Sequence, residues 1–493
     1  MTSALAYLVP ALPVLWVVPL LATRTPAGAD RLNVVAGVVC AAAGLWLAGL
    51  VLARGGAAPL HGRLYLLDGA SGLYIALIAV VGLGSAVMSP VYLRGAGRSW
   101  FSAERSRHWY YAALYLFWGA LFAVPIAGNL AICWLLIEAT TAASAMLVAF
   151  TGRRNSLEAG WKYLVLTTLG LSVTLLGIVV LALLLTQHGH GGIGALDWHA
   201  LARQAQALPK EPTLVAFVFI LAGLATKVGW APVHNWLPDA HSEAPAPVSA
   251  MLSAALLPTV ALVAWRVKNV LGAAAGTNAA RALFLGFGLA SLLIAVPFLW
   301  RALPWKRLLA YSSLEHMGVI ALGIGFGTPL AIAGVVIHVA GHGLAKALGF
   351  LAALPLLRVE PGAASEPAAG VLSASPATAW AMGVSLGALG GVPPSPLFVS
   401  ELLILLGGIQ AHDTAVAAIA ALALALGFLG LLHALIEGVV GVPEGGSRRA
   451  HHRSERPIVL LTAVTSVALV ALTVAGALLA DSAFVTTLSR GAL

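Results

Sequence analysis

Long apolar runs recur along this chain from one end to the other, and they constrain its fold more than any other feature. Each run is about 20 residues long, the length of helix that crosses the hydrocarbon core of a bilayer. Only 9% of the residues are charged, whereas soluble globular chains carry about 25%. The sequence therefore predicts an all-α polytopic membrane protein, and its formal charge of +9 gives no reason to expect a nucleic-acid partner.

About fourteen membrane segments follow from these runs, and two of them are interrupted by proline and glycine. The segments span 3–22, 32–53, 67–93, 109–127, 130–150, 162–186, 213–243 (interrupted), 247–270, 281–300, 306–326, 330–356, 374–409 (interrupted), 413–439 and 457–481. The connections between them are too short for a soluble domain. We expect an N-terminal three-helix segment at 1–108, two five-helix halves at 109–270 and 281–439, and a cytoplasmic loop with the C-terminal helix at 440–493.

The distribution of arginine and lysine predicts the orientation. With the N-terminus outside, the cytoplasmic loops hold about twice as many of these residues as the opposite loops, to which Arg266 and Lys268 are assigned. Both termini are therefore expected on the outer side of a bacterial-type plasma membrane. The run 3–22 has no basic segment before it, so we expect a retained helix and not a cleaved signal.

Several ionisable residues lie within these apolar segments or at their start. Such residues are rare in membrane spans, and each one is a functional hypothesis by default. They are Glu138, Lys162, Lys227, Glu315, His316, His338, His342, Lys346 and Glu401. Together they predict a polar path through the membrane.

His338, His342 and Lys346 are spaced four residues apart. Steps of four turn a helix by about 400° and rise about 6 Å, so the three side chains form one stripe about 12 Å long. A stripe of titratable groups suits a proton relay. The alternative is two histidines bonded to the backbone and a lysine that extends to the surface, but Glu315 and His316 on the preceding segment favour the relay.

The two interrupted segments contain clusters of prolines that break a helix beside a charged residue. The prolines are Pro232, Pro238, Pro245 and Pro247 after Lys227, and Pro393, Pro394 and Pro396 before Glu401. Unwound backbone at membrane depth is tolerated only inside protein or beside water. Broken helices at matching places in two halves are typical of transporters built from inverted repeats. Segments 4–8 and 9–13 are the candidate repeats, each with one interrupted helix.

Glu138 and Lys227 are predicted to form a switchable pair in the first half. Close together, each side chain keeps the other charged, and separation favours release of the lysine proton. The alternative is a static buried ion pair that only fixes helix packing.

The sequence predicts no metal site and no cofactor. Cys40 and Cys133 lie in apolar runs, where they are expected to be core residues without a disulfide. His338 and His342 have the HxxxH spacing of zinc ligands, but the third member of their stripe is Lys346 and no carboxylate is in register. Zinc is therefore disfavoured.

A second polar cluster follows the first break. It contains His234, Asp239, His241 and Glu243. Its spacing matches no catalytic pattern, so loop and cap roles are favoured over a catalytic centre. We expect a non-catalytic subunit.

Four stretches together resemble the antiporter-like proton-translocating family. That family comprises the large membrane subunits of respiratory complex I, hydrogenase-4, formate hydrogenlyase, Mrp antiporters and the two-part inorganic-carbon uptake system. The stretches are TKVGWAPVHNWLPDAHSEAPAPVSA, KRLLAYSSLEHMGVIALGIGFG, HVAGHGLAKALGFL and GGVPPSPLFVSE. SLEAGWKY and LLAYSSLEHMG look closest to component F of hydrogenase-4.

The resemblance implies roles for matching positions. Glu138 matches the acid of the fifth helix and Lys227 the lysine of the broken seventh. The stripe His338, His342 and Lys346 matches the central relay of the eleventh helix. Glu401 matches the exit residue of the broken twelfth, a lysine or a glutamate in other members.

Two departures from the family pattern bear on this transfer. Many members carry a lysine or histidine on the eighth helix, where this chain offers Ser249, Ser253 and Thr259, so one link depends on water or on Ser253. The start of the tenth helix, often acidic before Lys-Arg, here reads Pro304, Trp305, Lys306, Arg307.

The favoured function is a proton-conducting subunit of a multisubunit complex. Protons would enter near Lys227 and Glu138, cross through the central stripe and leave past Glu401. The partner would be a hydrogenase-type redox module or the zinc-containing subunit of a carbon-uptake system. The alternatives are an autonomous cation/proton antiporter and an inactive scaffold. Few carboxylates are available for a sodium site, which disfavours the antiporter.

Overall fold

The computed structural model describes residues 2–54, 60–62, 64–95, 105–354, 370–441 and 456–479. Helices make up nearly all of these residues, and a two-stranded sheet joins β1 (Leu60–His61) to β2 (Leu66–Leu67). The N-terminal helices are α1 (Thr2–Ala22), α2 (Pro26–Leu52) and α3 (Gly69–Gly95). The first half contains α4 (Arg105–Ile126), α5 (Leu130–Val148), α6 (Arg154–Gln187), the short α7 (Trp198–Gln204), α8 (Lys210–Val228), α9 (Leu237–Glu243), α10 (Ala246–Met251) and α11 (Leu257–Ala275).

The predicted second half comes next along the chain. It contains α12 (Thr277–Leu299), α13 (Trp305–Phe326), α14 (Pro329–Ala352), the short α15 (Val371–Ala374), α16 (Pro376–Leu389), α17 (Pro396–Gln410) and α18 (Thr414–Ala434), and α19 (Arg456–Leu479) ends the described chain. Within these residues, 13 helices are long and apolar enough to cross a membrane. The remaining predicted segment, 374–409, is present as the two shorter helices α16 and α17. The prediction of an all-α polytopic membrane protein is confirmed.

The first break separates α8 from α9. α8 ends at Val228, and its C-cap, Gly229, has a φ of 80°, a left-handed conformation that glycine adopts without strain. Pro232 lies in the break, and Pro238 lies in the first turn of α9. The Trp236 indole donates to the carbonyl of Thr226 at 2.7 Å, and the Trp230 indole donates to that of Met317 at 2.7 Å. The Trp236 indole thus satisfies a carbonyl in the last turn of α8 that the break leaves free, and the Trp230 indole ties the break to the middle of α13.

The second break separates α16 from α17 and has a similar plan. Gly391 has a φ of 70°, Pro393 and Pro394 follow it, and Pro396 begins α17. The Ser395 hydroxyl caps α17 by accepting from the amide of Phe398 at 3.2 Å. Both interruptions lie where the prolines predict them. The inverted relation of the two halves stays a prediction. Five segments per half is an odd number, so the second half would begin on the opposite side of the membrane from the first, as an inverted repeat requires.

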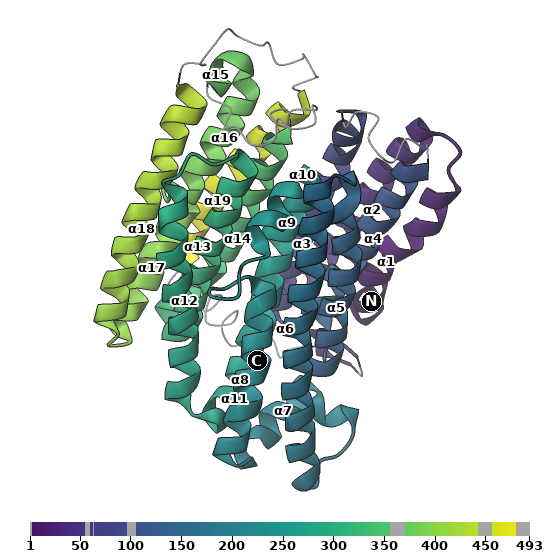
Figure 1. Cartoon of the computed structure of the whole chain (residues 1–493). Helices are drawn as coiled ribbons and strands as arrows, with labels where there is room; N and C mark the ends of the chain where they lie inside the picture. The colour runs from purple at the N-terminus through teal and green to yellow at the C-terminus, as the bar shows by residue number, and fades with distance from the viewer. Residues whose placement is uncertain are drawn as a thin grey trace.

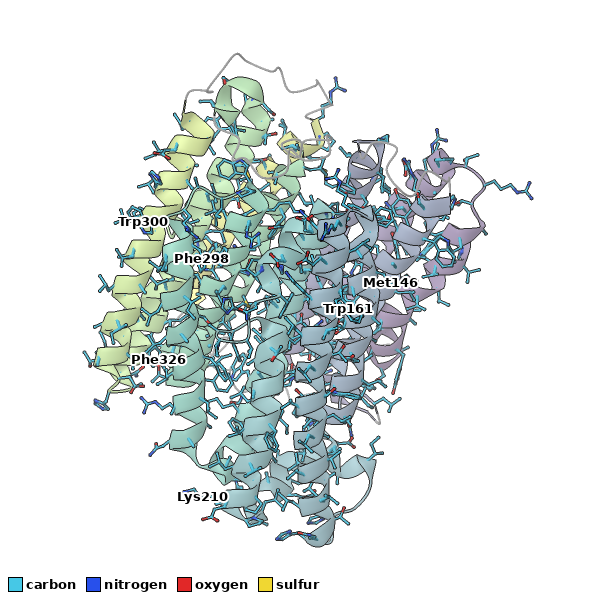
Figure 2. All side chains as sticks on the ribbon, in the orientation of Figure 1. Met146, Trp161, Lys210, Phe298, Trp300 and Phe326 are labelled. Carbon is cyan, nitrogen blue, oxygen red and sulfur yellow. The ribbon has the colours of Figure 1, made fainter. Side chains whose placement is uncertain are left out.

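In Figure 1, α1, α2 and α4 lie at one side of the bundle and α12, α17 and α18 at the other, whereas α19, the last helix, lies between them beside α14 and α16. The span 246–275 and α13 are buried throughout their most apolar windows, so they form the centre. Outer helices expose large apolar side chains instead: Met146 and Trp161, labelled in Figure 2, are 63% and 66% exposed. This distribution suits a bundle surrounded by lipid.

The structure corrects one residue used for the orientation. Arg266, assigned to an outer loop, is fully buried on α11 and pairs with Asp68 at 2.9 Å. It also donates to the Ser71 hydroxyl and the Pro125 carbonyl. An arginine is buried only when paired in this way, so Arg266 ties α11 to α3 and α4. Most of the predicted loops at 94–108, 357–373 and 440–456 lies outside the described residues, and the orientation stays a prediction.

Candidate functional site

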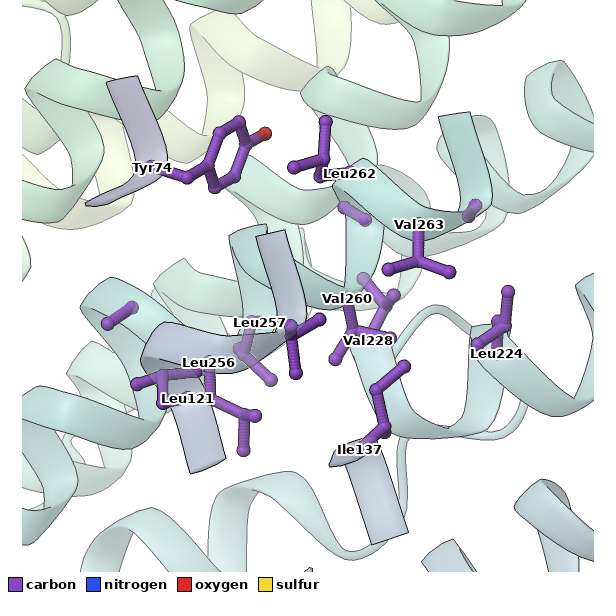
Figure 3. Packing of buried hydrophobic residues seen from close by; sticks show 14 of the residues in the cluster. Tyr74, Leu121, Ile137, Leu224, Val228, Leu256, Leu257, Val260, Leu262 and Val263 are labelled. Atoms are coloured by element: carbon purple, nitrogen blue, oxygen red, sulfur yellow. The ribbon is translucent and has the colours of Figure 1, made fainter. Parts of the chain in front are cut away.

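Lys227 lies in the last turn of α8 and is fully buried. Its ammonium donates to the Thr141 hydroxyl at 2.8 Å and to the Tyr163 hydroxyl at 2.5 Å. The Tyr163 oxygen also lies 2.7 Å from the hydroxyl of Ser144. Apolar side chains surround this end of α8, including Val228 and Leu224 (Figure 3). The lysine ammonium is therefore held by hydroxyl groups in an otherwise apolar region.

Glu138 does not form the direct pair with Lys227 that the sequence predicts. It is partly buried on α5 and accepts a hydrogen bond from Thr168 at 2.8 Å. Its second carboxylate oxygen is buried without a hydrogen-bond partner. Within the described chain, the ion pairs do not include Glu138 with Lys227. Thr141 and Tyr163 accept two of the three ammonium donors of Lys227. Glu138 is bonded to Thr168 instead, so that it acts on Lys227 only electrostatically, without a direct ion pair.

Lys162 lies outside the buried path to which the sequence assigns it. Its side chain is 45% exposed and pairs with Glu158 at 2.6 Å and Asp239 at 3.4 Å. Asp239 also pairs with Arg307 at 3.1 Å. Lys162 thus belongs to a surface network beside α9, because it sits two turns into α6 on the exposed face.

Lys346 is fully buried on α14, and its ammonium donates to the Leu309 carbonyl at 2.6 Å. The Ser313 hydroxyl donates to the same carbonyl at 2.8 Å. The Ser313 oxygen in turn lies 2.8 Å from that of Ser253, on the π-helical turn between α10 and α11. Many relatives have a basic residue on the eighth membrane segment, which in this chain spans 247–270. Here that segment is connected to Lys346 through the hydroxyls of Ser253 and Ser313 and the carbonyl of Leu309.

Three histidines meet between α13 and α14. Nδ1 of His316 lies 3.1 Å from Nε2 of His338, and Nδ1 of His338 lies 2.9 Å from the Ser400 hydroxyl. The ring of His342 lies 5.1 Å from that of His316. All three are fully buried, and neither ring nitrogen of His342 makes a hydrogen bond of ordinary geometry. The structure therefore brings His316 into the predicted stripe.

Two carboxylates border this histidine cluster. Glu315 on α13 is 2% exposed, and one of its oxygens lies against Gly427 of α18, where an added Cβ would be only 1.9 Å away. Glu401 is partly buried on α17, one turn after the second break. One atom each of Glu401, His316 and His338 lies within 4.8 Å of the other two. The predicted exit residue thus adjoins the relay.

His241 was assigned a loop or cap role, but it points into the bundle. It is fully buried on α9, its Nδ1 lies 2.9 Å from the Leu237 carbonyl, and its Nε2 has no hydrogen-bond partner. Its ring lies 6.0 Å from Trp236 and 5.8 Å from Phe350 of α14. Residues two apart on a helix differ by about 200°, so Asp239 faces the surface while His241 faces inward. The two-residue spacing of Asp239 and His241 was the signal in the sequence that could have predicted the inward position of His241.

Lys306 is a second residue whose contacts the sequence did not predict. Its ammonium, in the first turn of α13, donates to the carbonyls of Ser242, at 2.6 Å, and Ala244. These carbonyls end α9, and cations are favourable at a helix C-terminus. Lys306 therefore ties the first broken helix directly to the helix that carries Glu315 and His316.

Comparisons with known proteins identify the family of this chain. Residues 127–427 match the family described as NADH:quinone oxidoreductase/Mrp antiporter, TM. The chain belongs to this family. It is 31% identical to a hydrogenase-4 component F homolog of Methylacidiphilum infernorum over 389 residues, which are 78% of this chain and 81% of that protein.

A second relative, an NADH-quinone oxidoreductase subunit N of Desulforudis audaxviator, is 31% identical over 412 residues, covering 81% of this chain and 76% of its own. A chain of respiratory complex I from Thermus thermophilus superposes with a TM-score of 0.80 at 24% identity, covering 99% of each chain, and shares the fold. The predicted resemblance is confirmed. The protein is an antiporter-like membrane subunit of the type found in complex I, hydrogenase and Mrp complexes.

Proposed function

We propose that this chain conducts protons through a multisubunit membrane complex. The observation that carries the proposal is a series of buried ionisable and hydroxyl groups that runs from one broken helix to the other. A buried ionisable group is expensive in a membrane and marks ion pathways or proton relays. The family membership supports the same function.

The proposed path starts at Glu138 and Lys227 and passes Thr141 and Tyr163, which hold the lysine. It reaches the centre by way of Ser253 and Ser313. Water would bridge the space between the hydroxyls around Lys227 and the pair Ser253 and Ser313. His241, whose Nε2 has no hydrogen-bond partner, is the titratable side chain best placed to pass protons across this space.

The second part of the path runs from Lys346 through the three histidines to Glu401. Hydrogen bonds join His316 to His338 and His338 to Ser400. The ring of His342 lies within 5.1 Å of that of His316. Imidazole can accept a proton on one nitrogen and release one from the other, which suits it to a relay.

The partner is proposed to be a redox module of the hydrogenase type, because a relative that aligns with 78% of this chain is a hydrogenase-4 component F homolog. Affinity purification in mild detergent, with mass spectrometry of the bound chains, would test this. A single large zinc-binding partner would instead favour a carbon-uptake system. Purification of the chain alone, with sodium-dependent exchange in liposomes, would favour an autonomous antiporter.

The function itself is tested with Lys227→Ala in the intact complex reconstituted into liposomes. Removing the buried ammonium should abolish proton movement, measured with a pH-sensitive dye inside the vesicles, while the complex stays assembled. Lys210→Ala is the matched control, because Lys210 begins the same helix and is exposed (Figure 2). Full transport by the Lys227 variant would eliminate the entry half of the path and support the scaffold alternative.

A further inference from the structure

The cluster of His316, His338 and Glu401 combines two features of a metal site. It contains two imidazoles and one carboxylate, and one ligand atom from each lies within 4.8 Å of the others. The two histidines are fully buried, and Glu401 is partly exposed. Among the described residues, this is the group of histidine and acidic side chains whose geometry allows shared coordination of one ion.

The ligand types and their spacing suit a divalent transition metal. Zinc binds imidazole nitrogen and carboxylate oxygen at about 2.0–2.2 Å, so two ligands at the corners of a tetrahedron lie about 3.3 Å apart. Nδ1 of His316 and Nε2 of His338 are already 3.1 Å apart. The Glu401 oxygen needs to approach by no more than about 1.5 Å, which a rotation of its side chain supplies. The fourth position is left for water, as in zinc sites with three protein ligands.

The charge around the cluster also favours a cation. Glu315, 2% exposed, has one carboxylate oxygen buried without a hydrogen-bond partner, and it interacts electrostatically with Glu401. Glu401 as a ligand and Glu315 through the electrostatic interaction supply negative charge that offsets part of the cost of burying the ion, and Glu315 also interacts electrostatically with Lys346. Lys346 is the opposing positive charge from α14, and its ammonium is bonded to the Leu309 carbonyl.

This cluster differs from the zinc pattern that the sequence disfavours. That pattern uses His338 and His342 on one helix and lacks a carboxylate. The rings of this pair are 6.4 Å apart and nearly parallel, at 11°. The structure instead supplies His316 from α13 and the carboxylate from α17, because the second break directs the start of α17 against α14.

We propose that His316, His338 and Glu401 form a binding site for Zn²⁺ or a similar divalent transition metal ion, and that the bound ion blocks the path. The ion would take one lone pair each from Nδ1 of His316 and Nε2 of His338, and the proton that one of these nitrogens now donates to the other would move to the second nitrogen of its own ring. With those nitrogens coordinated, neither ring can pass a proton to the other. Binding is therefore expected to be inhibitory and to be reversed by a chelator.

The test measures metal binding before transport. The complex is purified without a polyhistidine tag, and the metal centres of its partner module are left in place. Co²⁺, whose visible absorption reports tetrahedral nitrogen and oxygen ligands, is titrated into it and the spectrum is taken as the difference from the untitrated complex; Zn²⁺ is then added in competition. The background chain carries glutamine at the exposed His188, His190 and His433 and at His451 and His452. These replacements remove other imidazoles that bind zinc weakly.

Three variants of that background decide the outcome. His338→Gln and Glu401→Gln should each weaken Co²⁺ binding by more than about 100-fold, the upper range for loss of a group that only supports a ligand. His342→Gln should leave the absorption spectrum and affinity nearly unchanged. Equal binding by all three variants, or loss of binding in the His342 variant alone, would overturn the proposed ligand set.

Transport provides a second, separate measurement. Micromolar Zn²⁺ should slow proton movement by the background complex, and a chelator should restore it. The binding titration stands even if the complex proves not to conduct protons, so failure of one proposal is distinguishable from failure of the other. Absence of a one-to-one Co²⁺ spectrum in a correctly assembled complex would overturn the metal site.

Discussion

The two halves of this protein hold their buried charges in different ways. In the first half, Lys227 is bonded to the hydroxyls of Thr141 and Tyr163, and the Tyr163 hydroxyl continues to Ser144. In the second half, three imidazoles contact one another and several of their nitrogens have no partner. A hydroxyl shell stabilises one charge in one place, whereas linked imidazoles offer several sites of similar chemistry. In the proposed path, we therefore expect the first half to hold a proton and the second half to pass it on.

The breaks in the two halves differ in a related way. The first break is secured by the indoles of Trp230 and Trp236 and, through Lys306, by the helix of the second half. The second break is followed, about one turn into α17, by the partly exposed Glu401. A displacement of α9 would therefore reach α13, and with it Glu315 and His316, through Lys306. This contact gives the two halves a physical route by which to influence each other.

His316→Gln is expected to have the largest effect, because His316 contacts both other imidazoles of the second half. Glutamine keeps hydrogen-bonding capacity but cannot accept and release a proton at neutral pH. Proton movement in liposomes should fall by about 100-fold or more, the contribution typical of a positioned acid or base. His433→Gln, on an exposed residue of α18, is the control. Normal transport by the His316 variant would show that water alone carries protons there, and the contrast between the halves would disappear.

Tyr163→Phe tests whether hydroxyls matter to the first half. The change removes one acceptor of the Lys227 ammonium, and a hydrogen bond to a charged group contributes about 1.5–3 kcal/mol. Transport should fall by about 10–100-fold, and Ser144→Ala should have a smaller effect because Ser144 acts through Tyr163.

Tyr110→Phe is the matched control for this experiment. Tyr110 is also fully buried and also has a hydroxyl partner, Ser89 at 3.0 Å, but it lies on α4 outside the path. Equal loss of transport in both variants would mean that general packing, and not the shell around Lys227, explains the effect.

Much of the fold could be predicted from the sequence because its signals are local. The length of an apolar run defines a span, and a cluster such as Pro393, Pro394 and Pro396 defines a break. Side-chain partners between distant helices are not local. Nothing in the residues around Lys227 shows that Thr141 and Tyr163, and not Glu138, would accept its hydrogen bonds.

The same limit explains the other errors in the site. Lys162 was assigned to the path because it lies near an apolar run, but it pairs on the surface with Glu158 and Asp239. Arg266 was assigned to a loop because it lies near a segment end, but Asp68, far away in the sequence, holds it in the interior. In both cases a partner on another helix decided whether the charge is buried.

Ser253→Ala should have the smallest effect and tests the connection between the halves. It removes the hydroxyl contact with Ser313 while Ser313 keeps its bond to the Leu309 carbonyl, which also accepts from Lys346. A neutral hydrogen bond contributes about 0.5–1.5 kcal/mol, so transport should fall by about 2–10-fold. Ser89→Ala, a buried serine outside the path, should have no such effect. Ser253→His would place a titratable group on the segment where many relatives have one, and transport faster than that of the parent chain would mean that the serine link is the slow step between the two halves.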